Sequence, residues 1–283
     1  MRLILSRKGF DTSCGGCPSP ILPDGRMVSL PIPDGRSPIR YADIRWGAGD
    51  LGAVVADLTR GHVAPSHPAH LDPDLRREGL PRCPGWRPLF GQTGAAQGHL
   101  RRSGVGPGDL FLFFGLYREA ARAEGRLRWA ARAPQRHVLW GWLQVDAVLP
   151  LAQPDVAPGW ARYHPHCSRP PEAADTLYVA RKRLALPGLA EGALRGAGVF
   201  AHLDRRLVLT APDAARPTEW LLPHWFHPRE GRPPLTYHAD PARWARSAEG
   251  ARLRAAPRGQ EFVFDMEGVP EAVPWLGALL SGA

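Results

Sequence analysis

The fold class is decided by two apolar stretches, Leu110-Phe-Leu-Phe-Phe114 and His137-Val-Leu-Trp-Gly-Trp-Leu-Gln-Val-Asp-Ala-Val-Leu149. Both are short, rich in aromatic or β-branched residues and bounded by turn-forming residues, which favours buried strands over helices. Val105-Gly-Pro-Gly-Asp109 precedes the first stretch, and a basic, polar insert separates the two. They predict the centre of a β-rich sheet.

Shorter segments on both sides extend this pattern. We expect further strands at 3–5, 176–180, 206–210 and 261–265, and short helices at 188–195, 241–253 and 270–280. Residues 50–100 show little periodicity, so we expect a functional loop region there. The combination predicts a β-rich α+β fold with a few short helices.

The chain has 283 residues, enough for one large or two modest domains. We divide it into an N-terminal strand-and-loop region (1–104), a central barrel-like region (105–222) and a C-terminal extension with helices (223–283). The three parts are expected to pack into one compact unit.

The formal net charge is +9, from 36 basic and 27 acidic residues, and nearly all the cations are arginines. A solvated surface and a nucleic-acid-binding face explain this charge equally well. No apolar stretch is long enough to cross a membrane, and the start of the chain lacks a secretory signal. We therefore expect a cytoplasmic protein with reduced cysteines. The oligomeric state is not indicated.

A polar block, Ser6-Arg-Lys-Gly-Phe-Asp11, follows the first expected strand, and Gly15 and Gly16 come soon after it. We predict that Arg7 and Lys8 hold a phosphate, with Ser6 and the two glycines beside it. Asp11 is then a nearby acid, base or ribose ligand. The alternative is a surface ion pair between Arg7 and Asp11 next to a flexible loop.

A second polar motif is His70-Leu-Asp-Pro-Asp74. Pro73 disfavours a helical conformation at Asp72. In extended backbone Asp72 and Asp74 point to one side and could share a proton or a divalent ion, with His70 beside them as a further catalytic candidate. The alternative is an ordinary helix start with Asp72 as its N-cap.

Other side chains are candidates for recognising a base. Gln92 and Gln97 offer the donors and acceptors that recognise a base edge, and His99 can titrate near neutrality. Trp142 and Tyr178 are the aromatic residues we choose for stacking on a base. The alternative for all five is packing.

Metal and cofactor motifs are sparse. Cys14-x-x-Cys17, Cys83 and His164-Pro-His-Cys167 contain zinc-type ligands, but a second compact pair is missing, so zinc is disfavoured and no metal ligand is assigned. We expect His164 and His166 to be loop residues that line the cleft. There is no dinucleotide fingerprint and no P-loop, so a classical nucleotide cofactor is not supported, and a divalent metal ion stays an open alternative.

The segment 105–149 resembles the PUA-like barrels, including the ASCH and EVE domains, and the likeness continues weakly to about residue 221. The whole chain more closely resembles the nucleotide modification associated domain 3 family, which is linked to DNA base hypermodification, and the motifs that carry this resemblance lie in the first 150 residues. The blocks that carry this second resemblance are 6–11, 18–21, 29–34, 70–75, 91–97 and 108–115.

The resemblance implies a protein that modifies a base in a nucleotide or nucleic acid, with DNA favoured. An enzyme that acts on a glycosyl bond or transfers a group is one reading. The alternatives are a non-catalytic reader of modified DNA or RNA, which uses a PUA-like aromatic pocket, and a structural partner in a modification complex. For the enzyme, residues 6–11 should face residues 70–74 in space.

Overall fold

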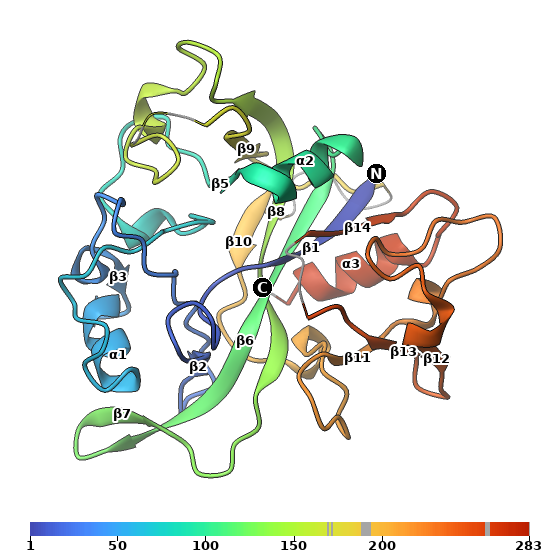
Figure 1. Cartoon of the computed structure of the whole chain (residues 1–283), viewed down its shortest axis with the longest axis horizontal. Coiled ribbons are helices and arrows are strands. Elements are labelled where there is room, and N and C mark those ends of the chain that lie inside the picture. Colours follow the sequence, from blue (N-terminus) through green and yellow to red (C-terminus); the bar gives the residue numbers. More distant parts are fainter. Residues whose placement is uncertain (169, 171, 188–193, 258–260, 283) are drawn as a thin grey trace.

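The two apolar stretches lie in the longest strands of the protein, β6 (Leu110–Ala123) and β8 (Arg136–Pro150), which pair antiparallel. This computed structural model describes residues 1–168, 170, 172–187, 194–257 and 261–282. Both strands cross the middle of the molecule (Figure 1). Most of their residues are buried, which explains why their sequences are continuously apolar rather than alternating.

The large sheet is mixed, and its strand order is β14-β1-β6-β8-β9-β5. β1 is parallel to β6, and the other pairs along this path are antiparallel. Three short strands extend it, because β2 and β7 pair with β6 and β10 pairs with β8. The remaining bounds are β1 (Arg2–Arg7), β2 (Ser19–Ile21), β5 (Leu89–Gln92), β7 (Arg126–Trp129), β9 (Thr176–Ala180), β10 (Ala197–Val199) and β14 (Glu261–Asp265).

Three α-helices and two small sheets surround this sheet in the described part of the chain. Figure 1 shows α1 and β3 on one side of the β6–β8 pair, and α3 with the β11–β13–β12 sheet on the other. The bounds are α1 (Leu51–Leu58), α2 (Gly94–Arg102), α3 (Ala272–Leu280), β3 (Arg45–Trp46), β4 (Gly49–Asp50), β11 (Glu219–Leu222), β12 (Trp244–Arg246) and β13 (Ala251–Arg254).

The large sheet curls until distant strands face each other. Phe90 of β5 packs against Phe111 and Phe113 of β6, with ring centroids 5.1 and 5.3 Å apart, although β8 and β9 lie between these strands in the sheet. At the edges, the Gln92 amide donates to Glu261 of β14 at 2.6 Å. No backbone pairing joins β5 to β14 among the described residues. The β-rich α+β class is confirmed, and the PUA-like barrel stays a prediction.

The strands expected at 3–5, 110–114, 137–149, 176–180 and 261–265 are present, and the helix expected at 270–280 is α3. The helix expected at 241–253 is wrong. A short 3-10 turn is followed there by β12 and β13, whose Trp244 and Leu253 pair across the strands. The strand expected at 206–210 is instead a 3-10 turn followed by isolated bridges.

The region 50–100 is not the continuous loop we expected, because it contains α1, β5 and α2. Asp50 caps α1 by accepting a hydrogen bond from Ala53 N, and the buried Leu51, Val54, Val55 and Leu58 recur at helical spacing. The helix expected at 188–195 falls largely outside the described residues.

All three segments of our division contribute strands to the large sheet. Residues 1–104 supply β1, β2 and β5, residues 105–222 supply β6 to β10, and residues 223–283 supply β14. A site at the edge of this sheet therefore depends on distant parts of the sequence.

Two buried histidines hold the C-terminal part in place as neutral rings. Trp220 Nε1 donates to His137 Nδ1 at 3.0 Å, and Ala256 N donates to His238 Nε2 at 2.9 Å. Each ring keeps an unprotonated nitrogen opposite a donor. Burial is the main cause that lowers the pKa of His137 to about 3 and that of His238 to about 4.

We predict that the free energy of unfolding falls as the pH drops below the ordinary histidine pKa of about 6.5. The unfolded chain then binds protons that folded His137 and His238 do not, so each histidine costs up to about 1.4 kcal/mol per pH unit until its folded pKa is reached. Urea denaturation between about pH 7 and pH 5 measures this slope. His238→Gln should flatten it, exposed His202→Gln should not, and equal slopes in both variants would contradict the assignment.

Candidate functional site

The loop between β1 and β2 is anchored at both ends. β1 and β2 pair with the same edge of β6, so the chain leaves the sheet at Lys8 and rejoins it at Ser19. Lys8 N still donates to Phe114 O at 2.8 Å. Gly115 is required beside it, because a Cβ there would lie 2.7 Å from the Lys8 carbonyl oxygen. These contacts fix the direction in which the polar loop leaves the sheet.

The charged side chains of this loop are paired with carboxylates. Arg7 contacts Asp11 at 3.0 Å, and Lys8 contacts the buried Glu261 at 2.9 Å. Burial opposes ionisation of Asp11, but hydrogen bonds from Ser13 and Cys14 and the charge of Arg7 outweigh it and lower its pKa. The ion pair between Arg7 and Asp11, which we weighed as the alternative to a phosphate clamp, is thus present.

The other residues predicted around this clamp are structural. Ser6 is fully buried within β1. Gly15 and Gly16 have φ values of +89° and +78°, a left-handed conformation that favours glycine. Gly15 also packs directly on the Phe10 ring, where a Cβ would be only 2.5 Å away. The glycines therefore shape the loop and do not line the cavity described below.

Asp72 lies among three imidazoles. Its Oδ1 accepts a hydrogen bond from Gly91 N at 2.7 Å and lies 3.3 Å from His164 Nε2. Its Oδ2 lies 3.8 Å from both His70 Nε2 and His166 Nε2. Burial works against the carboxylate, but the contact with His164 and the other neighbouring imidazoles outweigh it and lower the pKa of Asp72 to about 2.

Two further carboxylates orient the histidines. His70 Nδ1 contacts Asp34 Oδ2 at 2.8 Å, and His166 Nδ1 contacts Asp175 Oδ1 at 3.0 Å. Within the described residues, His70, Asp72 and His166 form a group whose potential metal-ligand atoms all lie within 4.8 Å of one another. Such a group can hold a divalent metal ion or transfer protons.

The loop and this cluster face one cavity of about 740 Å³, here called the polar cavity. Its lining includes Arg7, Lys8 and Asp11 from one wall and His70, Asp72 and His166 from the other, with Gln92 and Glu261 also lining it. We expected residues 6–11 to face residues 70–74. Arg7, Lys8 and Asp11 do line the same cavity as His70 and Asp72, whereas Asp74 does not line it.

Asp74 does not share this site with Asp72. It accepts two hydrogen bonds from Arg82, at 2.6 and 2.7 Å, and one from Tyr163 OH at 2.5 Å. The Asp74 and Arg82 side chains are only 1% and 4% exposed. The expectation that Asp72 and Asp74 share a proton or a metal ion is wrong for this geometry, because Asp74 is engaged in a buried ion pair.

The residues predicted to recognise a base are spread over the molecule. Gln92 lines the polar cavity, whereas Gln97 is buried in α2 and accepts a hydrogen bond from Tyr178 OH at 3.0 Å. His99 contacts Thr236 Oγ1 at 3.1 Å. Trp142 is buried and donates to Arg195 O at 3.1 Å. Tyr178 and Trp142 therefore lie in the core with their polar atoms satisfied.

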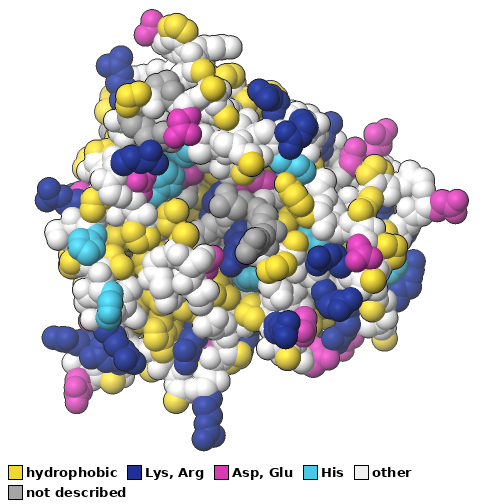
Figure 2. Space-filling view, in the orientation of Figure 1, with side chains coloured by type: hydrophobic (Ala, Val, Ile, Leu, Met, Phe, Trp, Pro, Cys, Tyr) yellow, Lys and Arg dark blue, Asp and Glu magenta, His cyan; other side chains and the backbone are white. Residues whose placement is uncertain are grey.

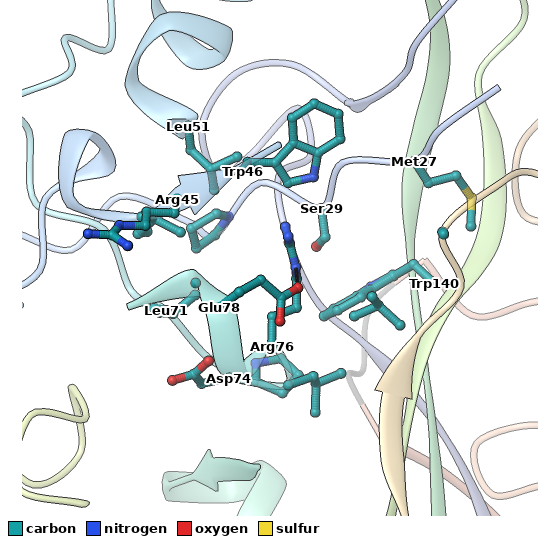
Figure 3. Close-up of a pocket in the computed structure, with 18 of the residues that line it drawn as sticks. Met27, Ser29, Arg45, Trp46, Leu51, Leu71, Asp74, Arg76, Glu78 and Trp140 are labelled. Carbon is teal, nitrogen blue, oxygen red and sulfur yellow. Dashed lines mark hydrogen bonds and ion pairs between the residues drawn. The ribbon is translucent and has the colours of Figure 1, made fainter. Parts of the chain in front are cut away.

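A second cavity of about 270 Å³, the apolar cavity, adjoins the polar one, and both are lined by Gly9 and Asp72. Figure 3 shows Trp46 and Trp140 on different walls, with the Arg76 and Glu78 side chains between them. Trp140 Nε1 is buried and has no hydrogen-bond partner among the described residues. The apolar cavity thus offers aromatic surface.

The surface and the cysteines add two observations. On the face in Figure 2, basic side chains form separate groups interleaved with acidic ones, not a continuous basic track. All four cysteines are free, and the metal-type group found in the described part of the chain contains none of them. No helix among the described residues is both long and apolar enough to cross a bilayer.

A family model described as nucleotide modification associated domain 3 matches residues 2–265. The chain belongs to this family. Membership associates it with the modification of nucleic-acid bases. No curated protein and no solved structure matches the chain. The family match spans both walls of the polar cavity and the strands that carry them.

Sequence reasoning missed the residues that complete the cluster. His164 and His166 were expected only as loop residues near the cleft. Asp34 was named only within the block 29–34 and given no role, and Asp175 was not considered. The signal for the histidines was their His-x-His spacing, which resembles a ligand pair. For Asp34 and Asp175 no local signal exists, because each meets its histidine only through the fold.

We predict that Asp74→Ala lowers the free energy of unfolding by about 3 to 5 kcal/mol, because it leaves the Arg82 charge buried without its partner. Asp146→Ala breaks the exposed pair with Arg87 and should cost less than about 1 kcal/mol. Urea denaturation compares the two variants. A cost for Asp74→Ala as small as the control would show that the buried pair does not stabilise this segment.

Proposed function

We propose that the protein is an enzyme that modifies a base of a nucleotide or nucleic acid, and that the reaction takes place in the polar cavity. The observation that carries this proposal is the convergence of Asp72 and its imidazoles with Arg7 and Lys8 in one cavity. The cavity volume lies in the range of ligand sites that bind small molecules. Family membership supports a base as the reacting group.

The low pKa of Asp72 favours one chemical role for this carboxylate over another. A carboxylate that is ionised far below neutrality is a weak general base, but it stabilises a positive charge well. We therefore assign to Asp72 the stabilisation of positive charge in the polar cavity, with His70 and His166 beside it.

Of the two cations of the polar loop, Arg7 is the better placed to meet a phosphate. Its guanidinium donates to Asp11 and to Pro257 O at the mouth of the polar cavity, and its side chain is 25% exposed. Lys8 is 10% exposed and paired with the buried Glu261, so its charge is less accessible. A phosphate would displace Asp11 from the Arg7 fork.

The second candidate function is a reader that binds a modified base without changing it. The apolar cavity favours it, because Trp46 and Trp140 line it and can contact a planar ring. One face of Trp46 is covered by Arg26, whose guanidinium carbon lies 4.8 Å from the ring centroid. A base would therefore stack on its other face.

We predict that expression of the wild-type protein in a bacterial host produces a nucleoside mass that is absent with Asp72→Asn. Mass spectrometry of nucleosides from DNA, RNA and the free nucleotide pool makes the comparison. Asp146→Asn serves as the control and should leave the product unchanged. Identical nucleosides with wild type and Asp72→Asn in all three pools would count against the enzyme.

Binding separates the two functions. For the enzyme, Arg7→Ala should weaken binding of a nucleoside monophosphate about tenfold or more, since a charge-assisted hydrogen bond is lost, and should reduce its salt dependence. For the reader, Trp140→Phe and Trp46→Ala should weaken binding of an oligonucleotide while Asp72→Asn has no effect on it. Isothermal titration of each variant decides between them.

A further inference from the structure

We infer that His70, Asp72 and His166 bind a divalent first-row transition-metal ion in the wall of the polar cavity. Two imidazoles and one carboxylate with open positions form the ligand set typical of non-haem iron(II) sites. Sequence spacing alone assigned no metal ligand, and the inference comes from how the fold brings these three side chains together.

The hydrogen bonds of this cluster leave three unprotonated acceptor atoms facing one another, the Nε2 atoms of His70 and His166 and Oδ2 of Asp72. Asp34 and Asp175 accept hydrogen bonds from the Nδ1 atoms of His70 and His166, so the two Nε2 atoms are unprotonated in the neutral rings. Both Nε2 atoms face Asp72 Oδ2. Three acceptors that point at one another repel unless a cation lies between them.

Protons relieve the repulsion between these three acceptor atoms less well than a metal ion does. The distances of 3.8 Å from Asp72 Oδ2 to both Nε2 atoms are too long for hydrogen bonds. If both rings were protonated, two imidazolium charges would lie side by side with centroids 5.2 Å apart. Metal bonds of about 2.1 Å place neighbouring ligand atoms roughly 3 to 3.4 Å apart, so each of the two distances from Asp72 Oδ2 to an Nε2 atom must shorten by less than about 1 Å.

The other oxygen of Asp72 is held by the protein. Gly91 N donates to Oδ1 at 2.7 Å, and His164 Nε2 lies 3.3 Å from the same atom. This leaves Oδ2 to bind a cation. Gly91 also makes room for His166, because a Cβ at this position would lie 2.3 Å from the imidazole ring. The position of His166 therefore depends on a glycine in β5.

The carboxylates behind the histidines follow the pattern of metal sites in which a carboxylate orients each imidazole. Asp34 uses its two oxygens separately, since Oδ1 accepts from Arg36 N at 3.0 Å and Oδ2 contacts His70 at 2.8 Å. Asp24 occupies the same position in the other Pro-Asp-Gly turn and caps Arg26 N at 3.1 Å, and no histidine contacts it in the described structure. The chain thus contains its own matched control.

Cobalt(II) titration of chelator-treated protein, followed by calorimetry and visible absorption, tests the site without any nucleotide. We expect about one equivalent bound, as one three-ligand group predicts. Asp34→Asn should weaken binding about 10- to 100-fold, and Asp24→Asn should not. His70→Ala and His166→Ala should weaken it more than Asp34→Asn, and exposed Cys14→Ser should have no effect. Urea denaturation establishes that each variant is folded.

Absence of cobalt(II) binding, or binding that survives both histidine variants, would overturn the inference. Equal binding by Asp34→Asn and Asp24→Asn would show that Asp34 does not orient His70 for metal binding. Gly91→Ala should also weaken binding, because it displaces His166. Metal binding without a modified nucleoside would leave this inference standing and count against the proposed function, so the two can fail separately.

Discussion

The structure depends on the pairing of β6 with two short strands along one edge. β1 and β2 lie end to end beside β6, and the residues between them cannot stay in the sheet. They form the polar loop, whose first residue remains bonded to Phe114 and whose carbonyl fits only because residue 115 is glycine. One wall of the polar cavity is therefore a consequence of strand pairing.

The curl of the sheet supplies the other wall. Phe90 lies against Phe111 and Phe113 inside the curl, so β5 is brought close to the polar loop. Gly91 and Gln92 then reach Asp72 and Glu261. Aromatic packing, which recognises no ligand itself, thus positions the polar groups of the cavity.

Much of the fold was predictable because its signals are local. β6, β8, β9 and β14 contain continuous apolar runs bounded by turns, and α3 is also an apolar segment that can be recognised locally. α1 is indicated by Asp50 as its N-cap and by the helical spacing of its apolar residues, but the polar residues around this segment led us to expect a loop. The segment 241–253 was predicted wrongly because its apolar residues are compatible with a helix, and only the pairing of Trp244 with Leu253 selects strands.

The site was predictable only in part. The block 6–11 and the motif at His70 and Asp72 were found from polar clustering, and they do line one cavity. The different environments of Asp72 and Asp74 were not predictable, because Arg82 and Tyr163 reach Asp74 only in the folded chain. Similarly, His166 joins the site from a loop almost a hundred residues later in the sequence.

The pairing of β1 with β14 also has a consequence for synthesis on the ribosome. Leu5 pairs with Phe262, and Lys8 contacts Glu261, so these contacts cannot form until the chain has been translated as far as residue 262. Pairings between such distant residues form slowly, because the chain loses the entropy of a long loop before the new contacts stabilise it. The polar cavity is therefore completed late, and a nascent chain carries its reactive side chains without the enclosure that would let them act together.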